Sequence, residues 1–265
     1  MKKAISFRLS GKTACFRKPD VNQYAYFTYN NIHKVALLGL LGAIVGYGGY
    51  TQLFEKNRGL KKGQLGYDDG YPEFYEKLKH LKVSITPLAT NGYFSKKIQV
   101  FNNSVGYANA VGAKPEERMK SSNLIVREQW LENPSWQIMI LDDGSDEYSK
   151  IKEYLLEKKS VFIPYLGKND HPANITEAKE IELQEKLFES DGEVYIDSLF
   201  LIPQSGFGFH KESDDMPFMF KEVSPVRLQK EYHFYEYEEL VFTNFEPNEL
   251  PQETYCYEDK NYAFI

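Results

Sequence analysis

The amino-acid sequence predicts an α+β fold. The opening segment AISFRLSG alternates the apolar residues Ile5, Phe7 and Leu9 with polar neighbours, a pattern typical of a half-buried strand. Residues 31–46 form an apolar run of helical length, and the 20 tyrosines and 18 phenylalanines favour strands elsewhere. A chain of 265 residues is long enough for one large domain or two modest ones.

Successive patterns predict a β-α-β-β-α-β order once residues 89–122 are set aside. The first strand is expected to continue past a bulge at Gly11 into TACFRK, and the helix over 31–46 follows it. The later elements are predicted as a short helix around 72–80, a strand near 82–88, strands at 123–131 and 135–143, a helix at about 145–158 and a strand at 161–167. This order is that of the ferredoxin-like split unit.

The helix predicted over 31–46 is apolar and rich in glycine. Asn30 and Asn31 are candidates for its N-cap. Gly39, Gly42 and Gly46 fall on one helical face, which predicts close packing, and we expect the partner to be the sheet. The 16 uncharged residues from Val35 to Tyr50 are fewer than the roughly 20 that a membrane span needs. We therefore expect a buried helix and no membrane contact.

Residues 89–122 are rich in asparagine and glycine, have little apolar periodicity and carry the paired lysines Lys96 and Lys97. Because so long an insertion in a compact domain is usually functional or disordered, we predict an extended hairpin or flexible arm. Residues from about 190 to 265 contain several strand-like segments and predict a smaller β-rich part beside a domain formed by 1–175. No obvious linker separates two independent domains.

The net charge of −6 hides a strong asymmetry. Residues 1–130 contain 20 Lys+Arg and 9 Asp+Glu, a net charge of +11, whereas residues 131–265 contain 12 and 29, a net charge of −17. This split favours a polyanion partner for the first half. The alternative is two surfaces that differ for reasons of solubility.

Motifs for catalysis or metal binding do not stand out. The five histidines form no i, i+4 pair, and DDGSD (142–146) lacks the ligand pattern of a calcium loop, so we expect no metal or cofactor. Cys15 and Cys256 form no C-x-x-C motif, and a reducing cytoplasm is the expected compartment. A tyrosine and histidine acid–base pair of the ribonuclease type stays possible, because its members need not be close in sequence.

Nucleic-acid features gather at the start of the predicted helix. Arg17 and Lys18 end the first strand in the segment FRKP. The segment TYNNIHK offers free backbone N–H groups at Asn30 and Asn31, an aromatic ring at Tyr29 and donors at His33 and Lys34. A helix N-terminus beside basic side chains is a natural phosphate site.

Three spaced segments together resemble CRISPR-associated (Cas) protein family five, the RAMP-superfamily subunit of type I Cascade effectors. They are FRKP with TYNNIHKVALLGLLGAIVGYGG, then REQWLENPSWQI, then IPYLGKNDHPANI. The resemblance covers roughly residues 3–175, and the variant looks like the type I-B branch. It implies a ferredoxin-like, RRM-type domain with a long β-hairpin thumb, which in this sequence falls at about 89–122.

The resemblance also implies a function and partners. It implies a non-catalytic subunit that grips the 5′ handle of the CRISPR RNA, caps the backbone-subunit filament, and meets the large subunit and, through the complex, target DNA. It suggests that Lys168 contacts phosphate from a turn at Leu166–Lys168; the alternative is a turn that only organises the fold and ends at Pro172. Arg127 is expected either on the RNA-facing side of a central strand or paired with neighbours of Glu128, and strand alternation makes Arg127 and Glu128 face opposite ways.

The sequence is also compatible with two functions other than RNA binding without catalysis. A branch of the family, in type I-C systems, cleaves precursor RNA, so a metal-independent endoribonuclease that uses His33 or Tyr29 is the second hypothesis. A scaffold whose basic half meets an acidic protein, with no RNA, is the third.

Overall fold

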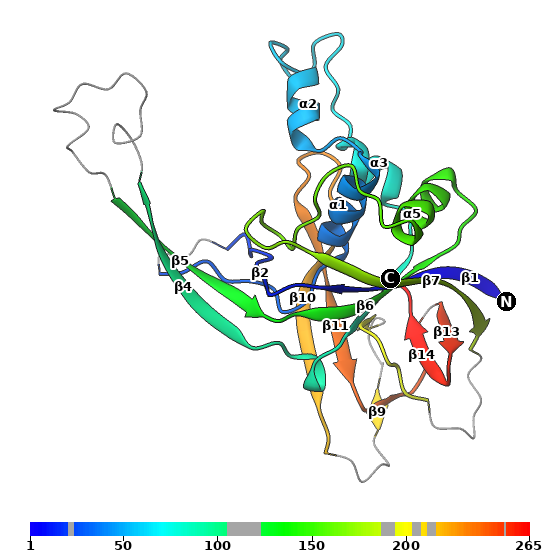
Figure 1. Cartoon of the computed structure of the whole chain (residues 1–265). Coiled ribbons are helices and arrows are strands. Elements are labelled where there is room, and N and C mark those ends of the chain that lie inside the picture. Colours follow the sequence, from blue (N-terminus) through cyan, green and yellow to red (C-terminus); the bar gives the residue numbers. More distant parts are fainter. Residues whose placement is uncertain (21–23, 105–122, 187–193, 203–207, 211–215, 252) are drawn as a thin grey trace.

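The structure is a computed structural model that describes the whole chain except residues 21–23, 105–122, 187–193, 203–207, 211–215 and 252. Its main sheet is antiparallel and has six strands in the order β14-β13-β7-β1-β6-β3 (Figure 1). Their bounds are β1 Lys2–Ser10, β3 Val83–Pro87, β6 Ser135–Leu141, β7 Asn174–Glu185, β13 Thr254–Tyr257 and β14 Lys260–Ala263.

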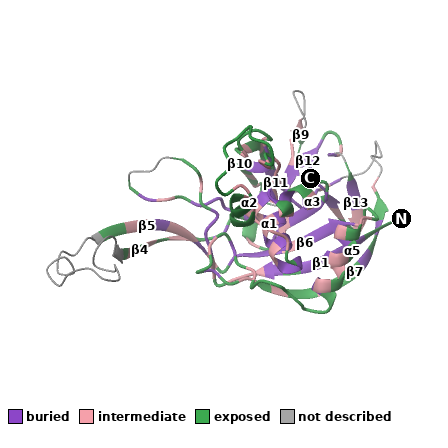
Figure 2. Cartoon of the chain, turned by 90° about the horizontal axis from the view of Figure 1, so that it is seen from above, coloured by how far each residue is buried: buried purple, intermediate pink, exposed green. Residues whose placement is uncertain are grey.

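The predicted β-α-β-β-α-β order is present in this sheet. The helices are α1 (Lys34–Val45), which follows β1, and α5 (Asp146–Leu156), which lies between β6 and β7. The predicted short helix is α3 (Glu73–Leu78). These three helices gather over one face of the sheet, and the residues between the layers are buried (Figures 1 and 2). The strand and helix patterns of the first 160 residues therefore predicted most of the elements that build the core.

Helix α1 is a buried core helix, as predicted, but its N-cap is His33 and not Asn30 or Asn31. His33 has extended backbone angles, and its side chain accepts a hydrogen bond from the N–H of Ala36. The two asparagine side chains bond to distant parts of the chain instead. Leu37, Leu38, Leu41 and Ile44 are almost fully buried and fix the helix in the core.

The glycine face of α1 packs against a helix rather than against the sheet. A Cβ atom on Gly42 would lie 2.5 Å from Cβ of Phe74 in α3, and one on Gly39 would lie 3.7 Å from the same ring. Gly46 ends the helix in the left-handed conformation, with φ of 84°. Close packing at the glycine face of α1 was predicted correctly. The predicted partner, the sheet, was wrong, because this face packs against α3.

Among the described residues, no single helix is long and apolar enough to cross a membrane. Helix α1 passes such a test only together with α2 (Tyr50–Lys56), and the two are bent by 72° relative to each other.

Three predicted strands differ from the structure. The continuation of β1 past Gly11 is β2 (Thr13–Ala14), which leaves the main sheet and pairs with β5 (Asn123–Glu132). Residues 123–131 therefore do not belong to the main sheet. The apolar segment 161–167 is a loop that is largely exposed, with only Leu166 buried, and the strand after α5 is β7. The alternation in β7 is interrupted by a register shift, and Glu177 has a φ of 58°, so its strand pattern is hard to recognise.

Strands β4 (Lys96–Ser104) and β5 form a long antiparallel hairpin that extends away from the main sheet (Figures 1 and 2). The hairpin contains part of the predicted arm, and its second strand is the segment predicted as a separate strand at 123–131. Residues 105–122 of the predicted arm lie outside the described residues. With β2 the hairpin makes a three-stranded sheet in the order β2-β5-β4, with β5 in the middle.

The strands after residue 190 fall into two groups. Strands β8 (Phe200–Leu201), β10 (Met219–Leu228) and β11 (Tyr235–Thr243) form a separate sheet, and β9 (Phe209–His210) pairs with β12 (Glu246–Pro247). Strands β13 and β14 extend the main sheet beside β7. The main sheet thus takes strands from both sides of the division predicted at about residue 175.

Candidate nucleic-acid interface

Residues 15–20 and 24–29 lie beside β5 at the root of the hairpin. The N–H of Tyr26 donates to the carbonyl of Arg127 (2.9 Å), and the N–H of Gln129 donates to the carbonyl of Tyr26 (2.8 Å). Arg17 forms an antiparallel bridge with Thr28. These contacts place FRKP, Tyr26 and Arg127 together although they are far apart in sequence.

Cationic side chains at this root lie over aromatic rings. The guanidinium carbon of Arg17 is 3.3 Å from the ring centroid of Tyr26, and that of Arg127 is 5.1 Å from the ring centroid of Tyr24. The ammonium of Lys168 is 5.5 Å from the ring centroid of Phe101 on β4. Such pairs are each worth about 0.5–1 kcal/mol at exposed sites. We call this set of six residues the arm-base surface: Arg17, Tyr24, Tyr26, Phe101, Arg127 and Lys168.

The arm-base surface is open to solvent. Arg17 is exposed, Tyr24 is 71% exposed, and the other four residues are half-buried. Arg127 and Glu128 face opposite ways, as strand alternation predicts, because Glu128 is buried. Arg127 lies on β5, the middle strand of the three-stranded hairpin sheet, and not on a strand of the main sheet.

Lys168 is placed by a tight loop. The carbonyl of Leu166 accepts from the N–H of Cys15 (3.1 Å), and Gly167 has a φ of 86°. A Cβ atom on Gly167 would collide with the carbonyl oxygen of Cys15. Only glycine therefore fits this turn, and the turn fixes the position of Lys168 beside the hairpin.

The Lys168 ammonium is not a free phosphate ligand, because it is paired with Glu128. It donates to both carboxylate oxygens (2.9 and 2.7 Å), and the Trp130 indole N–H donates to Oε2 (3.1 Å). Burial alone raises the pKa of Glu128, but the Lys168 and Trp130 hydrogen bonds outweigh it, so this pKa lies below its usual value. The pKa of Lys168 is raised, because its pairing with Glu128 outweighs its own burial. Both groups therefore stay charged.

The paired lysines lie at the start of β4. The ammonium of Lys96 is 4.9 Å from the ring centroid of Tyr93, and burial lowers the pKa of Lys96. The ammonium of Lys97 is 5.7 Å from the ring centroid of Trp130 and 3.9 Å from Glu132. Both side chains belong to the root of the hairpin and not to its distal part.

The start of α1 is closed, in contrast to the prediction of a phosphate site there. Tyr29, Asn30, Asn31 and His33 are at most 4% exposed. The carboxylate of Glu222 on β10 accepts from the N–H of Asn30 (2.8 and 3.1 Å) and of Asn31 (3.3 Å). An anion from the protein itself therefore occupies the free N–H groups that were predicted to hold phosphate.

The side chains at this helix start also have internal roles. Asn30 donates to the carbonyl of Gly92 (2.8 Å) and accepts from the N–H of Phe94 (3.2 Å). Asn31 accepts from the Trp136 indole (3.0 Å). The Lys34 ammonium donates to the carbonyl of Ile265 (2.9 Å), and burial lowers its pKa to about 8. Direct contact of these three side chains with RNA is therefore not supported.

His33 and Tyr29 are buried side by side, with ring centroids 5.3 Å apart. Burial lowers the pKa of His33 to about 3, and its Nδ1 accepts from Ala36 (3.1 Å). Burial also raises the pKa of Tyr29, with Tyr237 adding to the effect. In the described part of the chain, no group of three His, Cys, Asp or Glu side chains is arranged to hold a metal ion.

The aromatic residues of the arm-base surface, Tyr24, Tyr26 and Phe101, were not identified from the sequence. Tyr24 and Tyr26 lie in the segment YAYF, a few residues after Arg17 and Lys18, and this interleaving of bases and rings was the available signal. Phe101 and the buried Glu128 gave no local signal, because their roles depend on how the hairpin meets the 165–168 loop.

Comparisons with known proteins support the fold. No family model matches this sequence, and no curated protein matches it significantly. The structure resembles a chain of a CRISPR RNA-guided surveillance complex, with a TM-score of 0.50, 12% identity and 94% of each chain covered. A CRISPR protein from Archaeoglobus fulgidus is similar at a TM-score of 0.44 and 9% identity, with 98% of each chain covered. At 12% identity, the first similarity establishes a shared fold.

Proposed function

We propose that this protein is a non-catalytic RNA-binding subunit of a type I CRISPR surveillance complex, of the kind formed by CRISPR-associated protein family five. The observation that carries the proposal is the arm-base surface, where arginine and lysine side chains lie over aromatic rings that are exposed (Tyr24) or half-buried (Tyr26 and Phe101). Cations neutralise phosphates, and aromatic rings stack on unpaired bases, which is how single-stranded RNA is bound. The fold shared with a surveillance-complex chain agrees with this role.

The ligand in this proposal is the 5′ handle of the CRISPR RNA. Arg17 is exposed and without a carboxylate partner among the described residues, so it is the strongest candidate for a phosphate contact. Lys18 lies next to it, with its ammonium 5.0 Å from the ring centroid of Tyr29. Arg127, Lys96, Lys97 and the Glu128-bound Lys168 surround the same root and add positive potential.

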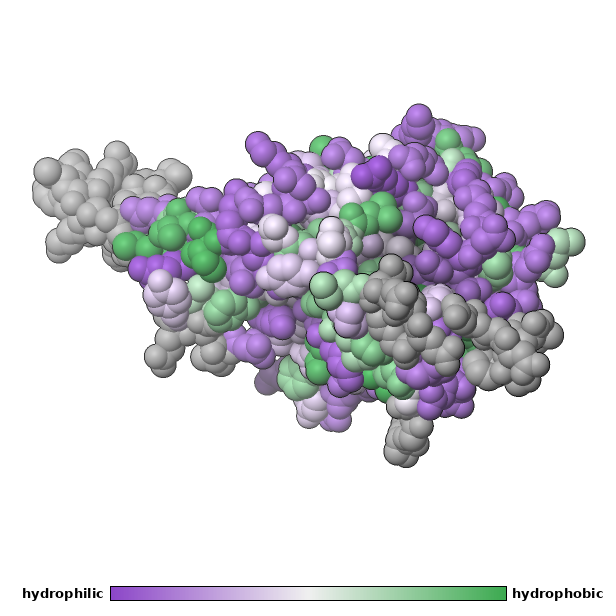
Figure 3. Space-filling view, turned by 90° about the horizontal axis from the view of Figure 1, so that it is seen from below, coloured by the Kyte–Doolittle hydropathy of each residue, from purple (hydrophilic) through white to green (hydrophobic). Residues whose placement is uncertain are grey.

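The hairpin serves as the thumb in this proposal and contacts the backbone subunit. Figure 3 shows hydrophobic surface on the hairpin. Ile98, Val100 and Ile125 are 46, 51 and 59% exposed there. An exposed apolar surface of this kind favours a protein partner. We further propose that the core is ferredoxin-like and of the RRM type and that the complex is of type I-B. In that complex the protein also meets the large subunit and contacts target DNA indirectly. Its proposed location is the cytoplasm.

The proposal assigns no catalytic role to His33 or Tyr29. A general base needs a pKa near the working pH and access to the substrate. His33 is 4% exposed with a pKa of about 3, and its Nδ1 already caps α1. These properties disfavour the endoribonuclease hypothesis, since neither ring is placed to exchange a proton with RNA.

Binding and cleavage of one labelled repeat-derived RNA test the proposal on native and denaturing gels. We expect binding without new bands. Arg17→Ala should weaken binding about fivefold to tenfold and reduce the slope of log affinity against log salt by about 0.7, the value for one phosphate contact on a single strand. Arg58→Ala, an exposed arginine in a different region, is the control and should change neither quantity. New bands, or equal slopes for the two variants, would contradict the proposal.

A further inference from the structure

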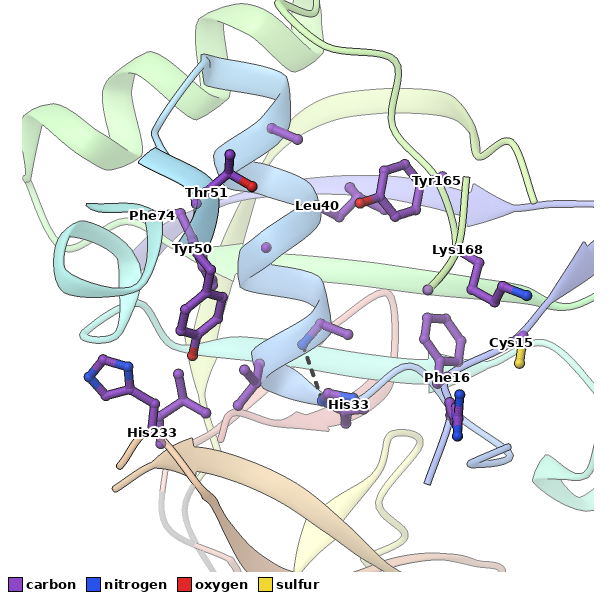
Figure 4. A pocket seen from close by; sticks show the side chains of 18 of the residues that line it. Cys15, Phe16, His33, Leu40, Tyr50, Thr51, Phe74, Tyr165, Lys168 and His233 are labelled. Carbon is purple, nitrogen blue, oxygen red and sulfur yellow. Dashed lines mark hydrogen bonds between the residues drawn. The ribbon is translucent and has the colours of Figure 1, made fainter. Parts of the chain in front are cut away.

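A groove of about 1020 Å³ runs over the outer face of α1, next to the arm-base surface. Its floor is made by small, half-buried residues of α1, Ala36, Gly39 and Ala43. Figure 4 shows Tyr165 and Lys168 on one side of the helix and Tyr50 and His233 on the other. Because the floor carries short side chains, the groove is open between two walls.

The walls of the groove are aromatic and exposed. Tyr50 is 49% exposed, Phe162 54% and Tyr165 46%. Tyr50 comes from α2, whereas Phe162 and Tyr165 come from the loop before Lys168, so the two walls belong to separate elements. Exposed rings that face one hollow indicate a ligand with apolar, flat parts.

Positive charge lies near both ends of the groove. Arg17 and Lys168 line it at the arm-base surface. The ring of Tyr47, which also lines it, has two ammonium groups close by, at 4.4 Å (Lys77) and 4.8 Å (Lys150) from the ring centroid. Lys77 is paired with Glu73 at 3.4 Å. Among the described residues, Lys150 has no carboxylate partner. Glu128 is the one carboxylate in the lining of this groove, and it is neutralised by Lys168.

We infer that this groove binds unpaired bases of single-stranded RNA that continues from the arm-base surface. The inference rests on the proposed function and extends it to a second part of the bound strand. Bases stack against Tyr50 and Phe162, and the phosphates before and after them lie near Arg17 and near the Lys150 ammonium group. Aromatic walls with cations at both ends are the composition of sites for single strands, whatever their base sequence.

Continuity with the arm-base surface favours RNA over an apolar peptide. Arg17 and Lys168 belong both to the arm-base surface and to the lining of the groove. An RNA strand bound at the arm-base surface can therefore continue into the groove. A peptide would be expected to meet polar backbone partners in the groove. The α1 floor offers few, because most of its N–H and carbonyl groups are bonded within the helix and the carbonyl of Ala43 accepts from the N–H of Phe162 (3.2 Å). Binding of a peptide or protein partner is the competing outcome in the test.

The test compares two double variants of the full chain. Tyr50→Ala/Phe162→Ala removes a ring from each wall. Tyr232→Ala/Phe234→Ala removes a stacked, exposed pair whose ring centroids are 5.7 Å apart and which does not line the groove. The probe is a repeat-derived single-stranded RNA with 2-aminopurine at successive positions, because stacking quenches its fluorescence. Thermal unfolding monitors the fold of both variants.

We expect the groove variant to weaken RNA binding at least about thirtyfold, the effect of two lost stacking contacts, and to restore fluorescence at a few adjacent positions. The control variant should bind as the unaltered chain does. Equal binding and quenching in both variants, with Arg17→Ala still weakening binding, would overturn the inference and leave the proposed function intact. If the groove variant keeps RNA but loses a protein partner of the complex, the inference is also wrong. If the unaltered chain binds no RNA, the proposed function fails and the inference fails with it.

Discussion

The start of α1 and the arm-base surface contain similar residues and differ in what surrounds them. Both combine aromatic rings with nitrogen donors, and sequence reasoning assigned both to RNA. At the start of α1, Tyr29, Asn30, Asn31 and His33 are buried, and Glu222 accepts the free N–H groups. At the arm-base surface, Arg17 and Tyr24 are exposed. The residue types indicate polar chemistry in each region, but burial decides whether that chemistry serves the fold or a ligand.

The largest expected effect is on stability, at the closed region. Asn30→Ala leaves the buried Gly92 carbonyl and Phe94 N–H without their partner. Because unsatisfied buried groups cost about 1–3 kcal/mol, we expect the free energy of unfolding to fall by about 2 kcal/mol. Urea denaturation measures this change, and the RNA affinity of the folded protein should stay the same.

Asn102→Ala is the matched control, since Asn102 is exposed on the hairpin. Its effect on unfolding should stay within about 0.5 kcal/mol. If Asn30→Ala instead leaves stability intact and reduces RNA affinity, the division into a closed and an open region is wrong.

The second effect is a pH dependence at the same closed region. The pKa of His33 is about 3 in the folded protein, below the ordinary value of 6.5 expected after unfolding. Below pH 6.5 the unfolded chain therefore binds a proton that the folded chain does not, and stability falls as pH decreases. The expected loss is about 1 kcal/mol between pH 6 and pH 5. Stability from this group is fully present above about pH 6.5.

His33→Asn should reduce this slope, because asparagine can cap the helix and does not titrate. Burial also lowers the pKa of His171 and of His233, so part of the slope remains. His80→Asn serves as control, since His80 is exposed and pairs with Asp143 at 3.0 Å. Urea denaturation at several pH values between 5 and 7 measures the slopes. A slope in His33→Asn as steep as that of the unaltered chain would mean that the His33 ring is not held neutral by burial.

The sequence predicted the elements whose patterns are local. α1 was identified from its continuous apolar run, and β6 and α5 from theirs, because each pattern depends only on neighbours in the chain. The segment 161–167 is equally apolar, but it forms an exposed loop; no local feature distinguishes it from a buried strand. β7 was missed for the opposite reason, since a bulge near Glu177 breaks its alternation.

The candidate site was predictable only in part. Arg17, Lys18, Arg127 and the turn that carries Lys168 were identified, and they do come together at the root of the hairpin. The closure at Asn30 was not predictable, because Glu222 is 192 residues away in sequence. The N-cap shows the same limit: Asn31 is preferred locally, but Trp136 uses its side-chain oxygen.

The smallest expected effect concerns the link between buried and exposed parts, the Glu128–Lys168 pair. Glu128→Gln removes the nearer of the two carboxylates that pair with Lys168 and keeps the shape of the side chain; the other, Asp170, is exposed and 3.7 Å away. Since Lys168 is partly exposed and can turn toward solvent, the expected cost in unfolding free energy is only about 1 kcal/mol. The freed ammonium should strengthen RNA binding and steepen the salt slope by about 0.7, as for one added phosphate contact.

Lys168→Gln separates this explanation from a general change in the loop. If Glu128 acts by holding the Lys168 charge, then Glu128→Gln in a Lys168→Gln background should leave the salt slope unchanged, because no ammonium is there to be released. A salt titration of RNA binding in the single and double variants decides this. A steeper slope in the double variant would show that Glu128 repels RNA directly. The Glu128 carboxylate, which is buried in this structure, would then count as part of the arm-base surface.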